Sequence, residues 1–173
     1  MTKTKEKFLI DSNSLITPYK MYYPFDFAKK FWDQLFERIE NQDVIVLDLV
    51  KDELIKGDDD LSEWISKINH ELVLDRIQPE IISNYKEVLD YLQTSGLYLE
   101  KALTNWSNAH IADPWLIASA RKYGLTVITL EKPNAGLKES NKAGSAKIPD
   151  VCNAFDVPCK DLFYMMRSLS FMM

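Results

Sequence analysis

The chain has 173 residues, of which 46% are hydrophobic and 27% charged, and this mixture is typical of a globular domain that buries a core. We therefore expect a single domain over residues 1–173. No apolar run approaches the roughly 20 residues that span a bilayer, and the apolar stretch before Asp11 has only three residues, too few for a signal peptide. The sequence thus predicts a cytoplasmic protein with no membrane segment. A net charge of −5 argues against a nucleic-acid binder with a broad positive surface, but not against a nuclease whose site is built from carboxylates.

The chain has two cysteines and two histidines. Cys152 and Cys159 lack the close C-x-x-C spacing of zinc and redox sites, so no zinc site is predicted. We expect both cysteines to be apolar residues of the core.

In the first half of the chain, short apolar runs alternate with amphipathic segments. Lys7–Ile10 is predicted to be a central parallel strand, and a loop rich in Tyr and Pro follows it. The next predicted elements are a helix over Pro24–Glu40 with Phe27 on its apolar stripe, a strand over Val44–Leu47, short helices over Leu49–Lys56 and Leu61–Asn69, and a candidate strand over Glu71–Leu74.

The second half contains the best-marked helix, Pro114–Tyr123. Asp113 suits its N-cap, Pro114 its first position and Gly124 its end. The other predicted elements are helices over Ile81–Leu92 and Tyr98–Trp106, a strand over Thr126–Thr129, a loop over Lys132–Lys147, a short helix or turn over Ile148–Phe155, an edge strand around Val157 and Cys159, and a terminal helix over Asp161–Phe171. Alternating strands and helices predict an α/β fold with a mainly parallel sheet of four to five strands flanked by helices.

Acidic residues stand where two of these strands end. Asp11 directly follows Phe8-Leu9-Ile10, and Glu131 follows Val127-Ile128-Thr129. The carboxyl ends of parallel strands meet at one edge of a sheet, where such folds bind ligands. Clustered carboxylates repel one another unless they hold a cation, and their oxygens suit Mg²⁺ or Mn²⁺.

Each acid also has a structural explanation. Asp11 could form an Asx turn or a cap, and capping alone explains the position of Asp113. Asp150 could cap its own helix or supply a further ligand. Glu53 lies beside the predicted apolar face of its helix, where a carboxylate needs a partner, but it could equally be solvated. A shift of one residue would bring in its neighbours Asp48 and Asp52.

Taken together, these segments resemble the PIN-domain family of metal-dependent nucleases. The matching segments are Phe8-Leu9-Ile10-Asp11-Ser12, Val50-x-x-Glu53-Leu54, Ala112-Asp113-x-x-Leu116-Ile117-Ala118-x-Ala120 and Val127-Ile128-Thr129-x-Glu131. Their order agrees with that family over nearly the whole chain. The most similar branch is a bacterial PIN-like group, DUF4411, marked by the ADPWLIA, T-x-E and IPDVC segments.

The resemblance implies a three-layer PIN-like fold and an endoribonuclease that hydrolyses RNA phosphodiester bonds. One or two Mg²⁺ or Mn²⁺ ions would activate a water, orient the scissile phosphate and stabilise the leaving oxygen. The residues that would hold the ions are Asp11, Glu53, Asp113 and either Glu131 or Asp150. The fourth position stays open because the usual T-x-D is here Thr129-Leu130-Glu131. Ser12 and Thr129 would orient the carboxylates.

The long predicted loop is cationic, and we hypothesise that it contacts RNA phosphates flanking the cut site. Its lysines are Lys132, Lys138, Lys142 and Lys147. The alternative is a loop that is simply solvated. Tyr19, Tyr22 and Trp115 are candidates for stacking on unpaired bases, although Trp115 fits the core equally well. His70 and His110 lie off the predicted edge, so the chain offers no convincing histidine general base. His110 is near Asp113 in the sequence and stays a candidate, with a capping or surface role favoured.

Small bacterial PIN proteins are often the toxins of toxin–antitoxin pairs, so the resemblance implies an antitoxin protein as partner, and a homodimer is a further expectation. The apolar C-terminal helix is a candidate interface, since a helix apolar on several sides buries more than one face. The main alternative is a PIN-like scaffold that binds other proteins without efficient catalysis. A haloacid-dehalogenase-type phosphatase is disfavoured by Asn13, where a second Asp is needed. A response-regulator-like receiver lacks a convincing acidic pair and later Lys.

Overall fold

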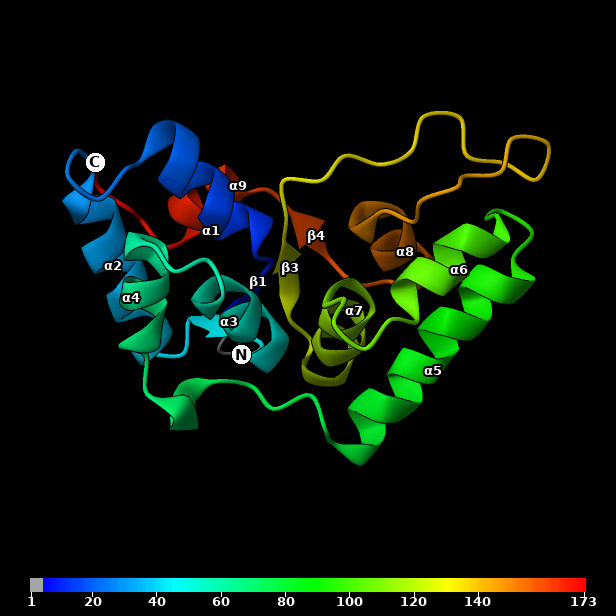
Figure 1. Cartoon of the computed structure of the whole chain (residues 1–173), viewed down its shortest axis with the longest axis horizontal. Helices are drawn as coiled ribbons and strands as arrows, with labels where there is room; N and C mark the ends of the chain where they lie inside the picture. Colours follow the sequence, from blue (N-terminus) through cyan, green and yellow to red (C-terminus); the bar gives the residue numbers. More distant parts are fainter. Residues whose placement is uncertain (1–4) are drawn as a thin grey trace.

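A computed structural model describes residues 5–173 and places a four-stranded sheet at their centre (Figure 1). Its strands are β1 (Phe8–Ile10), β2 (Val44–Val46), β3 (Thr126–Ile128) and β4 (Cys159–Lys160). The strand order is β2-β1-β3-β4, and every pairing is parallel. The predicted α/β fold with a parallel sheet is therefore confirmed, with four strands in the described part of the chain. Residues 1–4, at the start of the predicted domain, lie outside the described residues.

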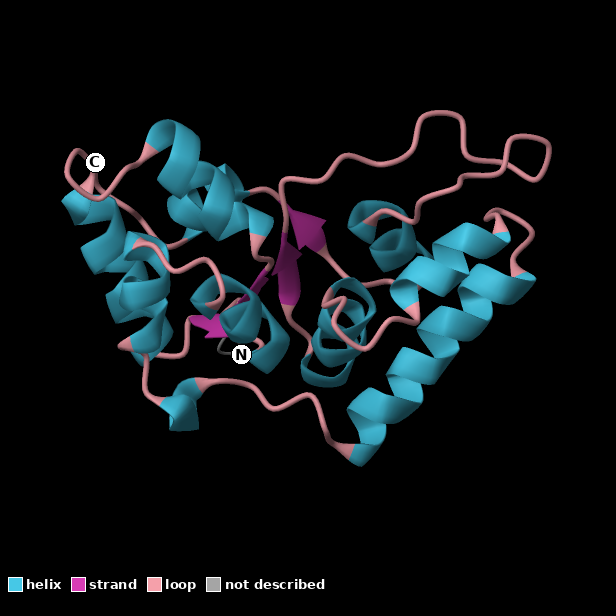
Figure 2. Cartoon of the chain, in the orientation of Figure 1, coloured by secondary structure: helices cyan, strands magenta, loops and turns pink. Residues whose placement is uncertain are grey.

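Helices cover both sides of the strands (Figure 2). Within residues 5–173 the nine α-helices are α1 (Asn13–Thr17), α2 (Lys29–Glu40), α3 (Asp48–Ile55), α4 (Asp60–Ser66), α5 (Pro79–Thr94), α6 (Glu100–Trp106), α7 (Asp113–Tyr123), α8 (Ile148–Ala154) and α9 (Leu162–Ser168). In Figure 1, α1, α2, α4 and α9 lie on one side of the strands, and α5 to α8 lie on the other. None of the helices described is both long enough and apolar enough to cross a membrane.

The centre of the core is β1, whose three residues are fully buried. α2 packs its buried face, which includes Phe31 and Leu35, against this core. An aromatic cluster continues the contact, with Trp32 stacked on Phe25 at 4.5 Å and edge-on to Trp64 at 5.0 Å between ring centroids. Each such side chain contributes about 1.5–3 kcal/mol by leaving water. This burial compensates for the shortness of the strands.

The Tyr- and Pro-rich segment after β1 is helical, so its prediction as a loop was wrong. It forms α1 and then a π-helical turn, η1 (Pro18–Tyr22). Pro18 occupies the C-cap of α1 and the first position of η1, where the chain passes from one helix type to the other. α2 correspondingly begins at Lys29 rather than Pro24. Phe27 lies in the turn before it and is 82% exposed, so its predicted place on the apolar stripe was also wrong.

Two other predicted elements differ from the structure. Glu71–Leu74 is not a strand: it lies mainly in a 3-10 turn, η2 (His70–Leu72), and only Leu74 pairs with the sheet, through a bridge to Leu47. The terminal helix, α9, ends at Ser168 instead of Phe171.

The apolar side chains of the C-terminal segment are mostly used inside the molecule. Leu162, Met165, Met166 and Leu169 are buried, whereas Phe163, Met172 and Met173 are exposed. The surface that this segment offers to a partner is therefore much smaller than its sequence indicates.

Gly124 ends α7 as predicted and turns the chain into β3. It adopts the left-handed conformation at φ 63°, and its N–H donates to the Ala120 carbonyl. An added Cβ would meet no atom within 4 Å, so the cost of a side chain here is conformational only.

We predict that Gly124→Ala lowers the free energy of unfolding by about 1 kcal/mol, because alanine enters the left-handed region at that cost. Gly124→Asn should lose less, since asparagine tolerates this region better. Urea unfolding of the three proteins tests this, and equal stability of the alanine variant and the wild type would contradict it.

Candidate functional site

Asp11 lies at the point where β1 leaves the sheet, and it is almost fully buried at 2% exposure. Its backbone N–H donates to the Ile128 carbonyl at 2.9 Å. The Thr129 hydroxyl donates to one carboxylate oxygen at 2.9 Å, and the Ser12 hydroxyl approaches the other at 3.4 Å. Burial raises the pKa of Asp11 to about 6, against the opposing effect of the Thr129 hydrogen bond, and the charges of Glu131 and Glu53 raise it further. Thr129 and Ser12 thus orient a carboxylate that is costly to ionise.

Asp113 brings a second carboxylate to the same edge from the other half of the chain. It is the first residue of α7, and the cap position is taken by Ala112. Asp113 thus stands in the first turn, one position after the N-cap, so the predicted N-cap position was wrong. Burial raises the pKa of Asp113 to about 7, followed by the charges of Asp11, Glu131 and Glu53, whereas Lys147 acts in the opposite direction. Capping therefore does not explain this residue.

Glu53 completes the acidic group from α3. Its side chain is exposed, yet its charge raises the pKa of both Asp11 and Asp113. The two alternatives considered for this position lie elsewhere. Asp48 forms an ion pair with Arg76 and accepts a hydrogen bond from the Leu49 N–H. Asp52 is exposed like Glu53, but its charge is not among those that raise the pKa of Asp11 or Asp113. The register of α3 thus favours Glu53.

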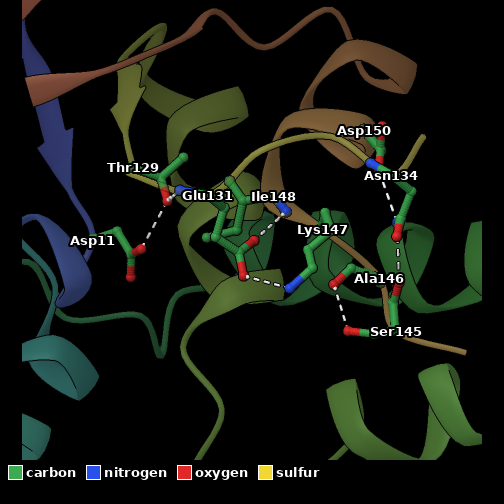
Figure 3. A network of polar contacts seen from close by, with 9 residues as sticks. All are labelled: Asp11, Thr129, Glu131, Asn134, Ser145, Ala146, Lys147, Ile148 and Asp150. Carbon is green, nitrogen blue, oxygen red and sulfur yellow. Dashed lines mark hydrogen bonds and ion pairs between the residues drawn. The ribbon is translucent and has the colours of Figure 1, made fainter.

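Glu131 and Asp150 have different surroundings (Figure 3). Glu131 follows β3, and its Oε2 accepts a hydrogen bond from the Ile148 N–H at 2.8 Å, while its Oε1 lies 3.3 Å from the Lys147 ammonium. Asp150 accepts two hydrogen bonds from Asn134, at 2.8 Å from the backbone N–H and 3.0 Å from the side chain. Asp150 therefore anchors the long loop, and of the two it is Glu131 whose charge acts on Asp11 and Asp113.

The four lysines of the long loop do not form one group. Lys132, Lys138 and Lys142 are exposed, whereas Lys147 is half-buried and faces Glu131. The loop itself is fastened to the segment before α6, where the Leu99 N–H donates to the Ala143 carbonyl at 2.9 Å. From the sequence, Lys147 is grouped with the other three lysines as a phosphate contact. The sequence cannot separate it from them, because only the fold decides which lysine lies beside the carboxylates.

The other candidate residues lie in the core or away from the acidic group. Trp115 is buried and stacks on Tyr85 at 3.9 Å, so a core role is favoured over base stacking. Tyr19 packs against Phe25, and Tyr22 is exposed. His70 and His110 are exposed. Cys152 is buried as expected, whereas Cys159 is only half-buried.

Ser14 is a site residue that sequence reasoning missed. It is fully buried, and its hydroxyl donates to the Ile128 carbonyl at 3.3 Å, which ties α1 to the end of β3. The run Asp11-Ser12-Asn13-Ser14 is the only sequence signal for this contact. It predicts the contact only if residues 13–17 are helical, because the helix places Ser14 beside the end of β3.

The arrangement places four carboxylates and one ammonium group at the carboxyl edge of a parallel sheet. Over residues 5–173 no group of three or more His, Cys, Asp or Glu side chains is close enough to hold a metal ion as they stand. A cation bound by Asp11 and Asp113 would therefore require side-chain rotation to bring a third ligand in. Such a cation would reduce the repulsion between the carboxylates and offset the cost of burying their charge, which together raise both pKa values.

Fold and site together define an α/β protein with an acidic group beyond the carboxyl ends of its central strands. The chain belongs to the DUF4411 family, described as a domain of unknown function, because that family's model matches residues 8–173. A search for similar curated proteins gave no match.

The raised pKa values predict that Asp113 destabilises the fold at alkaline pH. In the folded state the pKa values of Asp11 and Asp113 are about 6 and 7, above their ordinary value of 3.8. The folded state therefore binds more protons than the unfolded state in this window, and stability falls as pH rises from about 4 to about 7. Without added metal, Asp113→Asn should raise the free energy of unfolding at pH 8 by roughly 1–3 kcal/mol and change it little at pH 4.

Urea unfolding at the two pH values measures this difference. Asp90→Asn, at an exposed position on α5, serves as the control and should show no pH-dependent gain. If Asp113→Asn were less stable than the wild type at pH 8, the carboxylate would have a stabilising partner and the assignment would be wrong.

Proposed function

We propose that the protein is a metal-dependent endoribonuclease of the PIN type that acts as the toxin of a toxin–antitoxin pair. One observation carries the proposal: Asp11, which is buried, and Asp113, which is half-buried, come from opposite halves of the chain and both have raised pKa values at the carboxyl edge of the sheet. The charge of Asp11 raises the pKa of Asp113, and the charges of Glu131 and Glu53 raise the pKa of both. A fold keeps such an arrangement at a cost in stability, and strongly perturbed carboxylates mark functional sites.

The donor chemistry of this group fits a hard divalent cation. Asp11 and Asp113 would hold Mg²⁺ or Mn²⁺, with Glu53 free to rotate toward them because its side chain is exposed. When bound, the ion would supply a Lewis acid for water activation and phosphate binding. Thr129 keeps the Asp11 carboxylate fixed through its 2.9 Å hydrogen bond, so that this ligand need not be ordered when the ion binds.

The choice of RNA and of a toxin role rests on the resemblance to PIN nucleases. The exposed Lys132, Lys138 and Lys142 are available for phosphates that flank the cut site. An antitoxin would have to approach this same edge to block it. The exposed Phe163, Met172 and Met173 provide apolar surface for a partner or a second copy of the chain.

A catalytically weak scaffold is the second candidate, and one observation favours it. Both carboxylate oxygens of Glu131 already have partners, the Ile148 N–H and the Lys147 ammonium. Glu131 is therefore satisfied without a metal ion, as expected for a purely structural site. An inert scaffold should show no rise in melting temperature with millimolar Mn²⁺, because the ion stabilises the folded state only if it binds to that state.

We predict that the protein cleaves RNA in Mn²⁺ or Mg²⁺ and that EDTA abolishes the cleavage. Asp11→Asn and Asp113→Asn should each lower the rate by at least about 10²-fold, because each removes a charged ligand of the ion. A panel of structured and single-stranded RNAs, followed by gel electrophoresis under single-turnover conditions, gives these rates.

Asp90→Asn is the matched control and should cut at the wild-type rate, because its carboxylate is exposed on α5. Cleavage that survives in both Asp11→Asn and Asp113→Asn would assign the activity to a contaminant or to another site. No cleavage and no Mn²⁺-dependent stabilisation of the wild type would favour the scaffold.

A further inference from the structure

Lys147 is set apart from the other lysines of the long loop by where its charge lies. Its ammonium is 3.3 Å from Glu131 Oε1, and its side chain is 35% exposed. The other three are exposed. The charge of Lys147 also opposes the rise in the pKa of Asp113, so it acts on Glu131, which follows β3, and on Asp113 of α7.

Glu131 holds Lys147 in this place by a two-point contact. One carboxylate oxygen takes the lysine ammonium and the other takes the N–H of the next residue, Ile148, at 2.8 Å. Ile148 is buried and begins α8, so the backbone beside Lys147 cannot swing away freely. Glu131 is itself tied to Thr129, whose hydroxyl accepts its N–H at 3.2 Å and donates to Asp11. Figure 3 shows this continuous path from Asp11 through Thr129 and Glu131 to Lys147.

A positive charge fixed among carboxylates has a specific use in a site that acts on phosphodiesters. The substrate brings negative charge to an edge that is already acidic, and more charge develops on the phosphate during cleavage. A half-buried ammonium is screened less by water than an exposed one, so it attracts a phosphate more strongly. Its exposed part leaves its remaining N–H donors able to reach a ligand.

We propose that Lys147 binds the scissile phosphate inside the carboxylate site and that Glu131 positions Lys147 instead of ligating the metal. This inference rests on the proposed nuclease function. In this arrangement Asp11 and Asp113 would bind the ion, with Glu53 beside them. Lys147 would bind the phosphate. Lys147 is thereby a catalytic residue, and Glu131 is a positioning residue.

The first test compares Lys147→Met and Lys147→Arg with Lys86→Met, whose lysine is exposed on α5. Single-turnover RNA cleavage in Mn²⁺ should fall about 10²- to 10³-fold in Lys147→Met, as for loss of a group that stabilises developing charge. Lys147→Arg should recover part of the rate, and Lys86→Met should equal the wild type. Calorimetric titration with Mn²⁺ alone should show tighter binding by Lys147→Met, on the order of tenfold, because a like charge has left the site.

The second test uses Glu131→Gln, which keeps an acceptor for the Ile148 N–H but loses the charge that holds Lys147. Its Mn²⁺ affinity should fall by no more than about tenfold, the electrostatic counterpart of the Lys147 effect, whereas loss of a metal ligand would weaken it far more. If Glu131 acts through Lys147, the double variant that combines Glu131→Gln with Lys147→Met should cut RNA no more slowly than Lys147→Met alone. A further loss in the double variant would overturn the positioning role.

Wild-type rates and unchanged Mn²⁺ affinity in Lys147→Met would overturn the role of Lys147 and leave the nuclease proposal standing. A wild type that neither cuts RNA nor binds Mn²⁺ would overturn both. Melting temperatures show whether each variant folds, and Lys147→Gln replaces Lys147→Met if that variant does not. Arginine rescue separates a charge effect from a packing effect, because arginine restores the charge with a different shape.

Discussion

The parallel pairing of β1 with β3 fixes the geometry on which the site depends. Leu9 is opposite Val127 and Ile10 is opposite Ile128, and the Asp11 N–H extends this pairing by one more bond to the Ile128 carbonyl. Since the strands run in the same direction, both leave the sheet at one edge, and Asp11 meets Thr129 there. A slip of one residue would turn the fully buried side chains of β1 to the opposite faces. Both faces of β1 and β3 are buried, so core packing on two sides holds these three-residue strands in place.

Charge balance links the stability of this edge to what it can bind. A carboxylate as buried as Asp11 is costly unless partners compensate it, and the hydroxyls of Thr129 and Ser12 compensate it only in part. Among the charged groups that act on Asp113, three are carboxylates and one is Lys147. A proton, a divalent cation or the lysine ammonium can each reduce the excess negative charge. The pH dependence of folding, the affinity for metal and the position of Lys147 therefore all follow from the excess negative charge at this edge.

The sequence predicts those parts of this structure that local signals determine. Apolar runs identify β1 and β3, and Pro114 with Gly124 bounds α7, so the parallel sheet and the position of Asp11 follow. The helical form of residues 13–22 escaped prediction because Pro18 and the tyrosines are equally common in loops. The roles of Asp113, Glu131 and Asp150 depend on which groups lie opposite each of them. The return of the long loop to α8 decides that Asn134 takes Asp150 and that Lys147 meets Glu131, and no local pattern contains this information.

The central claim is that Asp11 and Asp113 together hold a divalent cation. The most direct measurement is an anomalous difference map from crystals soaked in Mn²⁺ at a pH above 7, where both carboxyl groups are ionised. The account predicts an anomalous peak between the two carboxylates, with Glu131 still bound to Lys147. Crystals saturated with Mn²⁺ that show no peak between Asp11 and Asp113 would contradict it.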